Sequence, residues 1–151
     1  MGLDMYLKKY IYVGANYDHN NVTGEISLKK DDKPIKINLK RVSYIVEEVA
    51  YWRKSNSIHG WFVDNVQEGK DDCKEYYVSK EKLQELLDLC KKVLKNPRQH
   101  QHLIQPRSGF FFGSTDNIDD YVYDLKKTVN QLEEVLKEKE GIFDYYYQSS
   151  W

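Results

Sequence analysis

The first hydrophobic pattern along the chain is an alternation over residues 3–13. Apolar and polar or tyrosine side chains take turns there, and this period of two is typical of a strand with one buried face. The sequence therefore predicts a strand with a core face and a tyrosine face. The two faces consist of Leu3, Met5, Leu7, Ile11 and Val13, and of Tyr6, Lys8, Tyr10 and Tyr12.

Shorter segments predict a loop and further strands. Residues 14–24 are polar and rich in turn formers, which indicates a loop. Residues 25–28 and 35–39 alternate again, and the polar segment 29–34 between them predicts a hairpin. Three more strands are predicted over residues 76–78, 110–112 and 142–147, the second of them a buried one.

Helical spacing of apolar residues predicts three helices. The first covers residues 42–63, with Ser43 as a candidate N-cap and a weak point at Gly60. The second begins after Ser79 and stops at Asn96-Pro97. The third is capped by Thr115 or Asp116 and ends at Gly141. The apolar stripes are Val42, Ile45, Val49, Trp52 and Val63; Leu83, Leu86, Leu87, Cys90, Val93 and Leu94; and Ile118, Val122, Leu125, Val129 and Leu132.

The predicted fold class is α+β, with a mixed, mostly antiparallel sheet packed against about three helices. The length of 151 residues fits one domain, residues 1–151, and the chain contains no internal repeat and no linker. Lysine and arginine number 23 against 24 acidic residues, so bulk charge does not favour nucleic-acid binding. No apolar run approaches a membrane span, and Cys73 and Cys90 read as reduced thiols of a cytosolic protein.

Aromatic residues are the unusual part of the composition, with 13 Tyr, 5 Phe and 3 Trp. Pairing of the first and last strands would build an aromatic wall from Tyr6, Tyr10, Tyr145 and Tyr147, with Tyr146 on the opposite face. Such a wall suits a ligand that is half planar and half polar, or a partner protein. The alternative is that the tyrosines only cover a sheet against helices.

A second candidate site lies on the predicted helix 42–63. Asn56 shares a face with Trp52 there, and His59 lies at its edge. With Arg53 and Arg107 these side chains would stack and hydrogen-bond a nucleobase-like ring. The alternative is that Asn56 and His59 are buried and bonded by backbone groups or tyrosine hydroxyls.

Other motifs give no catalytic residue and no metal site. The Ser108–Asp116 segment offers a phosphate-binding turn or, more simply, a helix cap. Cys73 follows two acidic residues, which disfavour a thiolate nucleophile paired with His59. His100 and His102 have no third ligand in sight, so a solvated loop is the simpler interpretation.

Several irregular, aromatic-rich segments resemble small bacteriophage- and prophage-encoded proteins of unassigned function. The segments are 1–7, 52–59, 61–67, 71–78, 108–116 and 143–151. The resemblance implies a protein of the cytoplasm of an infected or lysogenic bacterial host and supplies no catalytic residues. Phage accessory proteins of this size often counter host defences, and this association adds weight to such a role.

The main functional hypothesis is a non-catalytic binding protein without a cofactor. It would sequester a small nucleotide-like ligand, held by Trp52, Arg53, Asn56, His59 and Arg107 within the tyrosine wall, or it would mask a host protein. One alternative is an enzyme acting on a nucleotide-like substrate with His59 as general acid or base. Another is an interaction protein whose aromatic wall forms a homo-oligomer interface.

Overall fold

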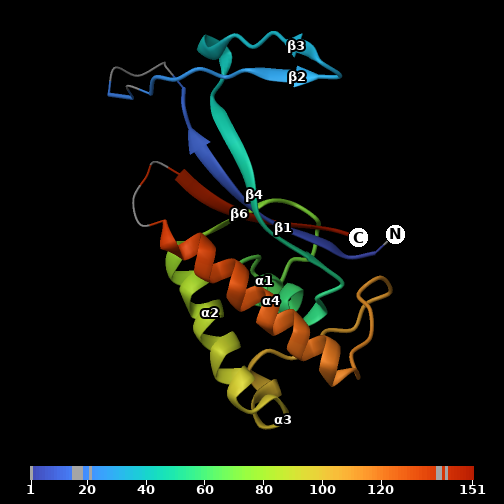
Figure 1. The fold of residues 1–151 in the computed structure, drawn as a ribbon. Coiled ribbons are helices and arrows are strands. Elements are labelled where there is room, and N and C mark those ends of the chain that lie inside the picture. The colour runs from blue at the N-terminus through green and yellow to red at the C-terminus, as the bar shows by residue number, and fades with distance from the viewer. Residues whose placement is uncertain (1, 15–18, 21, 139–140, 142) are drawn as a thin grey trace.

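The computed structural model describes residues 2–14, 19–20, 22–138, 141 and 143–151, and it has the predicted α+β class. Four antiparallel strands form a sheet in the order β4-β1-β6-β5, and three long helices cover one of its faces (Figure 1). The sheet strands are β1 (Asp4–Tyr12), β4 (Tyr44–Arg53), β5 (Tyr76–Val78) and β6 (Phe143–Ser150). The helices are α1 (Asn56–Asn65), α2 (Lys80–Lys95) and α4 (Ile118–Lys137), with a short α3 (Pro97–His100). A separate hairpin consists of β2 (Leu28–Lys30) and β3 (Lys33–Ile35).

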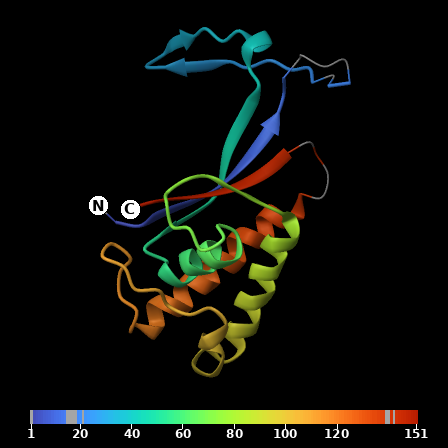
Figure 2. The same cartoon turned by 180° about the vertical axis from the view of Figure 1, so that it is seen from behind.

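The alternation of the first strand matches the two faces of the sheet, and its pairing places it between two other strands. Leu3, Met5 and Leu7 are fully buried against the helices, as the sequence predicted. β1 pairs with β4 on one side and with β6 on the other, so the first and last strands are direct neighbours. Figure 2 shows α1, α2 and α4 together on one side of these strands.

The predicted helix over 42–63 is wrong in its first half, because residues 44–53 form strand β4 and Ser43 caps nothing. The spacing of the apolar residues fits a helix, but the same segment is rich in β-branched and aromatic residues, which favour strands. Lys54, at a φ of 55°, ends the strand, and α1 begins only at Asn56. Gly60 lies inside α1 and does not break it.

A bulge interrupts the pairing of β4 with β1. Leu7 lies opposite Ala50 and Lys8 lies opposite Glu48, so Val49 is an extra residue. Beyond this bulge the inner face of β1 continues with Lys9, which forms ion pairs with Glu47 and Glu138 in place of apolar packing.

The second helix is confirmed and the bounds of the third are corrected. The Ser79 hydroxyl accepts from the backbone of Lys82, and α2 ends at Lys95, before Asn96. α4 is capped by Asn117 instead of Thr115 or Asp116, since the Asn117 side chain accepts from two backbone amides. It ends at Lys137 rather than at Gly141, because Glu138 already has an extended backbone.

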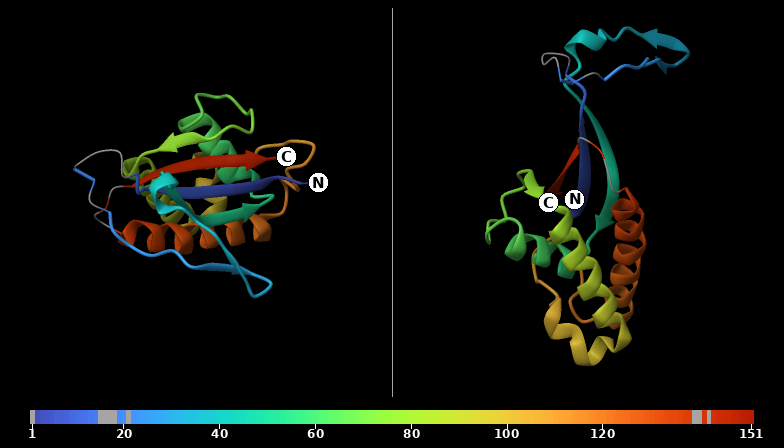
Figure 3. Two further views of the ribbon diagram at one scale, coloured as in Figure 1. Left: turned by 90° about the horizontal axis from the view of Figure 1, so that it is seen from above. Right: turned by 90° about the vertical axis from the view of Figure 1, so that its left-hand side faces the viewer.

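The predicted hairpin exists, but its strands lie closer to the turn than the alternation indicated. Asp31 and Asp32 form the two-residue turn at φ values of 51° and 60°, a left-handed pair typical of tight hairpins. Residues 22–43, which we call the arm, project beyond the sheet and the helices (Figures 1 and 3).

Two other segments differ from expectation. Residues 110–112 form a turn instead of a buried strand, since Phe110 is 95% exposed and only Phe112 is buried. The loop expected after Pro97 contains α3 and a short 3-10 turn over Gln101–Leu103. The predicted loop over 14–24 contains no helix or strand where it is described, and its residues 15–18 and 21 lie outside the described residues.

Candidate functional site: a tyrosine face on the open side of the sheet

The open side of the sheet carries seven tyrosine side chains among charged and polar residues. Strand register fixes it, because residues opposite one another point to the same side. Tyr6 lies opposite Tyr51, Tyr12 opposite Tyr44, and Tyr77 opposite Tyr146. We call this surface the tyrosine face. It consists of Tyr6, Tyr10, Tyr12, Tyr44, Tyr51, Tyr77 and Tyr146.

Five of these rings form a continuous chain across four strands. Tyr10 is its centre, with ring centroids 4.9 Å from Tyr146 and 5.8 Å from Tyr44. The chain continues to Tyr12 and Tyr77 through centroid distances of 5.3 and 6.0 Å. Most contacts are tilted or edge-on, the geometry that the charge distribution of aromatic rings prefers. Tyr44 and Tyr77 remain 52% and 57% exposed, so the packed rings still present a wide aromatic area to solvent.

A polar network fixes the middle of the tyrosine face. The Lys8 ammonium donates to Glu75 at 2.6 Å and to Gln148 at 2.8 Å, and the Tyr10 hydroxyl donates to Glu75 at 2.8 Å. Partial burial alone would raise the pKa of Glu75, but the bonds from Lys8 and Tyr10 outweigh it and lower that pKa. Burial and the bond to Glu75 raise the pKa of Tyr10, so its hydroxyl stays a donor. The surface therefore carries fixed hydroxyl groups between its rings.

The predicted aromatic wall is confirmed in its pairing and corrected in its members. Tyr6 and Tyr10 lie on the tyrosine face, but Tyr145 and Tyr147 point to the opposite side and are buried against the helices. Tyr146 takes their place on the open side. The register decides this, because Lys8 of the tyrosine-bearing side of β1 lies opposite Tyr146. The β-branched and aromatic residues of 44–53 were the signal for a strand carrying Tyr44 and Tyr51, but the helical interpretation of that segment concealed it. The bulge at Val49 places these two tyrosines on the same side of the sheet.

The residues of the second predicted site do not all lie together, because Trp52 and Arg53 belong to strand β4 while Asn56 and His59 belong to α1. Trp52 belongs to the sheet, is fully buried, and donates from its indole to Thr128 at 2.8 Å. Asn56 begins α1, and it is bonded by backbone groups. Its amide donates to the carbonyls of Phe112 and Ser114, and its oxygen accepts from the amide of Arg107.

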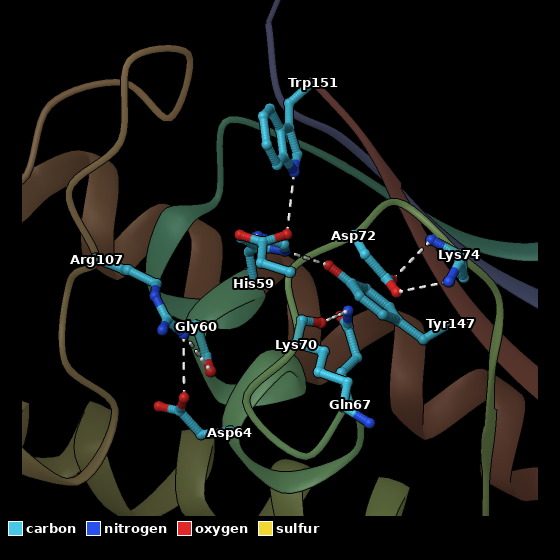
Figure 4. A network of polar contacts seen from close by, with 11 residues as sticks. His59, Gly60, Asp64, Gln67, Lys70, Asp72, Lys74, Arg107, Tyr147 and Trp151 are labelled. Carbon is cyan, nitrogen blue, oxygen red and sulfur yellow. Dashed lines mark hydrogen bonds and ion pairs between the residues drawn. The ribbon is translucent and has the colours of Figure 1, made fainter.

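His59 lies in the protein interior between two partners (Figure 4). One ring nitrogen is 2.8 Å from the Tyr147 hydroxyl and the other is 2.9 Å from an Asp71 carboxylate oxygen. Since a carboxylate only accepts, Nε2 carries the proton and Nδ1 accepts from Tyr147. The second oxygen of Asp71 accepts from the indole of Trp151 at 3.0 Å, so the last residue closes this cluster.

The surroundings of His59 keep its imidazole neutral and shield it from solvent. Burial lowers its pKa, and this effect outweighs the opposing influence of Asp71. Tyr147 stacks on Phe62 with centroids 3.9 Å apart, and burial raises the pKa of its hydroxyl well above the usual value. Because both ring nitrogens are bonded and the ring has no exposed surface, this geometry does not support His59 as an acid or base for a substrate.

Arg53 and Asn56 do share a cavity, of about 270 Å³, at the start of α4. Its tyrosines are Tyr121 and Tyr123 of α4 instead of those of the first and last strands. Two carboxylates of α4, Asp120 and Asp124, also line it, and burial raises the pKa of Asp124 to about 6. Arg107 lies outside this cavity, where it forms an ion pair with Asp64 at 3.1 Å.

The remaining candidates form no reactive site in the part of the chain that the structure describes. No group of three or more His, Cys, Asp and Glu side chains is placed there to hold a metal ion. Both cysteines are free, and burial raises the pKa of Cys90 to about 12, so that it remains a thiol. Of the helices that are described, none is both long enough and apolar enough to cross a membrane.

Comparison of the chain with protein-family models, with curated proteins and with solved structures finds no match. A function can therefore be inferred only from the geometry of the described residues. The tyrosine face is the most extensive surface feature among them.

Proposed function

We propose that this chain is a non-catalytic binding protein that masks a host protein by covering it with the tyrosine face. In this proposal it acts as a phage accessory protein in the cytoplasm of a bacterial host, a setting that follows from the resemblance alone. The observation that carries the binding role is the unbroken chain of tyrosine rings on the sheet face opposite the one that α1, α2 and α4 cover. Such a face is chemically suited to a partner because each ring combines apolar area with a hydroxyl.

The chemistry of the tyrosine face favours a protein partner over a nucleic acid. Tyrosine is enriched at the centres of protein interfaces, where it supplies much of the binding energy. Single-stranded nucleic acids also stack on aromatic platforms, but they require a basic groove along the backbone. Here Lys8 is neutralised by Glu75, and Asp4 accepts from the Tyr51 hydroxyl, so the surface has both signs of charge.

The test is capture of a partner from bacterial lysate, followed by measurement with the purified pair. Tyr10→Ala removes the centre of the ring chain and should weaken binding by about 2 kcal/mol or more, as for a central interface residue. Isothermal titration calorimetry with the identified partner measures this loss.

Tyr123→Ala is the matched control, because Tyr123 is 67% exposed on α4 and belongs to a different surface. It should leave the affinity within about twofold of the unchanged protein. If Tyr10→Ala binds the captured partner as tightly as the Tyr123→Ala control, the tyrosine face is not the binding surface and the proposal fails.

A second candidate function is sequestration of a small polar ligand, which the cavity with Arg53 and Asn56 favours. A cation and two carboxylates on one cavity, beside the exposed ring of Tyr123, suit a ligand with a planar ring and charges of both signs. Mass spectrometry of the small molecules released by heating the purified protein tests this. An Arg53→Ala variant that releases the same molecule in the same amount would exclude the cavity as its site.

A further inference from the structure

The arm exposes apolar side chains that nothing in its own hairpin covers. Leu28 and Ile35 lie opposite each other and are 51% and 48% exposed. A two-stranded hairpin by itself is marginally stable in water. The exposed apolar pair on this projecting element is therefore available to pack against another surface.

One face of the hairpin combines this apolar pair with positive charge. The register places Lys30 opposite Lys33, two positions along from the pair of Leu28 and Ile35 and therefore on the same face. Lys29 lies opposite Pro34 and points to the other face. The face of the hairpin that carries Leu28 and Ile35 thus has two apolar side chains followed by two lysines near the turn.

Charge is distributed unevenly between the arm and the rest of the chain. Residues 22–43 contain six lysines and arginines and three acidic residues, which gives the arm a net charge of +3. The whole chain has a net charge of −1, so the remaining residues together carry −4. The rest of a second copy therefore has an overall charge opposite to that of the arm.

The outer side of α2 has the features that the hairpin face requires. A groove of about 710 Å³ runs along α2 beside the end of α4. Leu89 and Leu136 provide its apolar part, and Glu81, Glu85 and Asp88 outnumber Lys80 and Lys92 among its charged groups. Glu85 is already paired with Lys82 at 2.8 Å, so Glu81 and Asp88 are the carboxylates that the arm would meet. The sheet separates this groove from the arm of the same chain in Figures 1 and 2, so the matching arm must come from another molecule.

We infer that two copies of this chain form a symmetric pair in which each arm lies in the α2 groove of the other. Leu28 and Ile35 pack on Leu89 and Leu136, while Lys30 and Lys33 approach the carboxylates of α2. A two-fold axis closes such an exchange, because both contacts are used once in each molecule. The contact involves the arm and the α2 groove and none of the seven tyrosines that define the tyrosine face, so this inference goes beyond the proposed function and does not depend on it.

The test uses two charge-reversed proteins that are complementary only to each other. The first carries Lys30→Glu and Lys33→Glu on the arm, and the second carries Glu81→Lys and Asp88→Lys in the groove. In each protein alone the arm and the groove have like charge. In a mixed pair both contacts join opposite charges.

Sedimentation velocity and light scattering should show a dimer for the unchanged protein and monomers for each charge-reversed protein alone. Mixing the two should restore a dimer, and about 0.5 M salt should weaken it by about tenfold or more. Lys29→Glu is the matched control, since it reverses a lysine of the same strand on the other face and should leave the dimer intact. Circular dichroism confirms that each variant is folded.

Three results would each overturn the inference. The first is an unchanged protein that stays monomeric at millimolar concentration. The second is a mixture of the two folded, charge-reversed proteins that stays monomeric. The third is a Lys29→Glu control that dissociates as readily as the Lys30→Glu and Lys33→Glu protein. Any of them would show that the arm does not occupy the groove of a second copy.

Discussion

Tyr146 and Tyr147 are neighbours in the sequence, yet they belong to the two most different environments of the molecule. Tyr146 lies on the open tyrosine face and contacts Tyr10 and Tyr77. Tyr147 is fully buried, stacks on Phe62 and donates to His59. The comparison shows that the side of the strand, and not the residue type, decides whether a tyrosine stabilises the fold or remains available to a partner.

Truncating each tyrosine in turn tests whether the two sides of the strand differ in their contribution to stability. Tyr147→Ala removes a buried stacked ring and leaves His59 without its donor, so it should lower the free energy of unfolding by about 3–5 kcal/mol. Tyr146→Ala should cost about 1 kcal/mol or less, because its ring is partly solvated. Urea unfolding followed by fluorescence measures both values, and equal losses would show that the open face is also structural.

The second test concerns the cluster around His59. His59→Phe keeps a ring of similar size but leaves the Tyr147 hydroxyl and an Asp71 oxygen without their bonds. The loss should be about 2–3 kcal/mol, since buried polar groups without partners are costly. The exposed analogue is Lys8→Met, which breaks the bonds to Glu75 and Gln148 at the solvent-facing network and should cost about 1 kcal/mol or less. A smaller loss for His59→Phe than for Lys8→Met would contradict the assignment of the cluster to the core.

The same histidine also makes a pH prediction. The pKa of His59 is lower in the folded protein than its ordinary value of 6.5. The unfolded chain therefore binds the proton first, and stability should fall as pH decreases below about 6.5. Unfolding curves between pH 7.5 and pH 5 should show this decrease in the unchanged protein and a weaker one in His59→Phe.

Asp124 should produce the opposite dependence on pH. Its pKa is raised from 3.8 to about 6 in the folded protein, so the folded state holds this proton more tightly. Stability from this group is present below about pH 4 and is lost as pH rises through about 6. Asp124→Asn should therefore increase stability at pH 7 by about 1 kcal/mol, less than the full shift implies because water still reaches the carboxyl. A destabilised Asp124→Asn protein would indicate that the ionised carboxyl is needed in the cavity.

Part of this architecture was readable from the sequence and part was not. Local patterns that allow one interpretation, such as the alternation around Met5 and the apolar stripe of Leu83 and Leu87, gave the correct element. Residues 44–53 allow two interpretations, because Val42, Ile45, Val49 and Trp52 are spaced as in a helix while the β-branched and aromatic side chains of the segment favour a strand. Pairing with the free edge of β1 decides between them, and that contact joins residues about forty positions apart.

The candidate site was harder to predict for the same reason. Composition showed a surplus of tyrosine, but only the register of β6 against β1 determines which of Tyr145, Tyr146 and Tyr147 face solvent. A shift by one residue would exchange the two faces of the strand completely. Likewise, no local signal connects His59 with Trp151, which meet through Asp71 only after the last strand is in place.

The smallest effect concerns the coupling between rings on the tyrosine face. A double-mutant cycle of Tyr10→Ala and Tyr146→Ala compares the loss in the double variant with the sum of the single losses. Their rings are 4.9 Å apart and edge-on, and such cross-strand pairs contribute about 0.5–1 kcal/mol. Urea unfolding measures this coupling within the stability of the fold, and calorimetry with a captured partner measures it within binding. A coupling of about 2 kcal/mol or more in unfolding would mean that the rings hold the sheet together. A small coupling in unfolding, together with losses in binding that exceed it, would mean that these rings contribute more to recognition than to the fold.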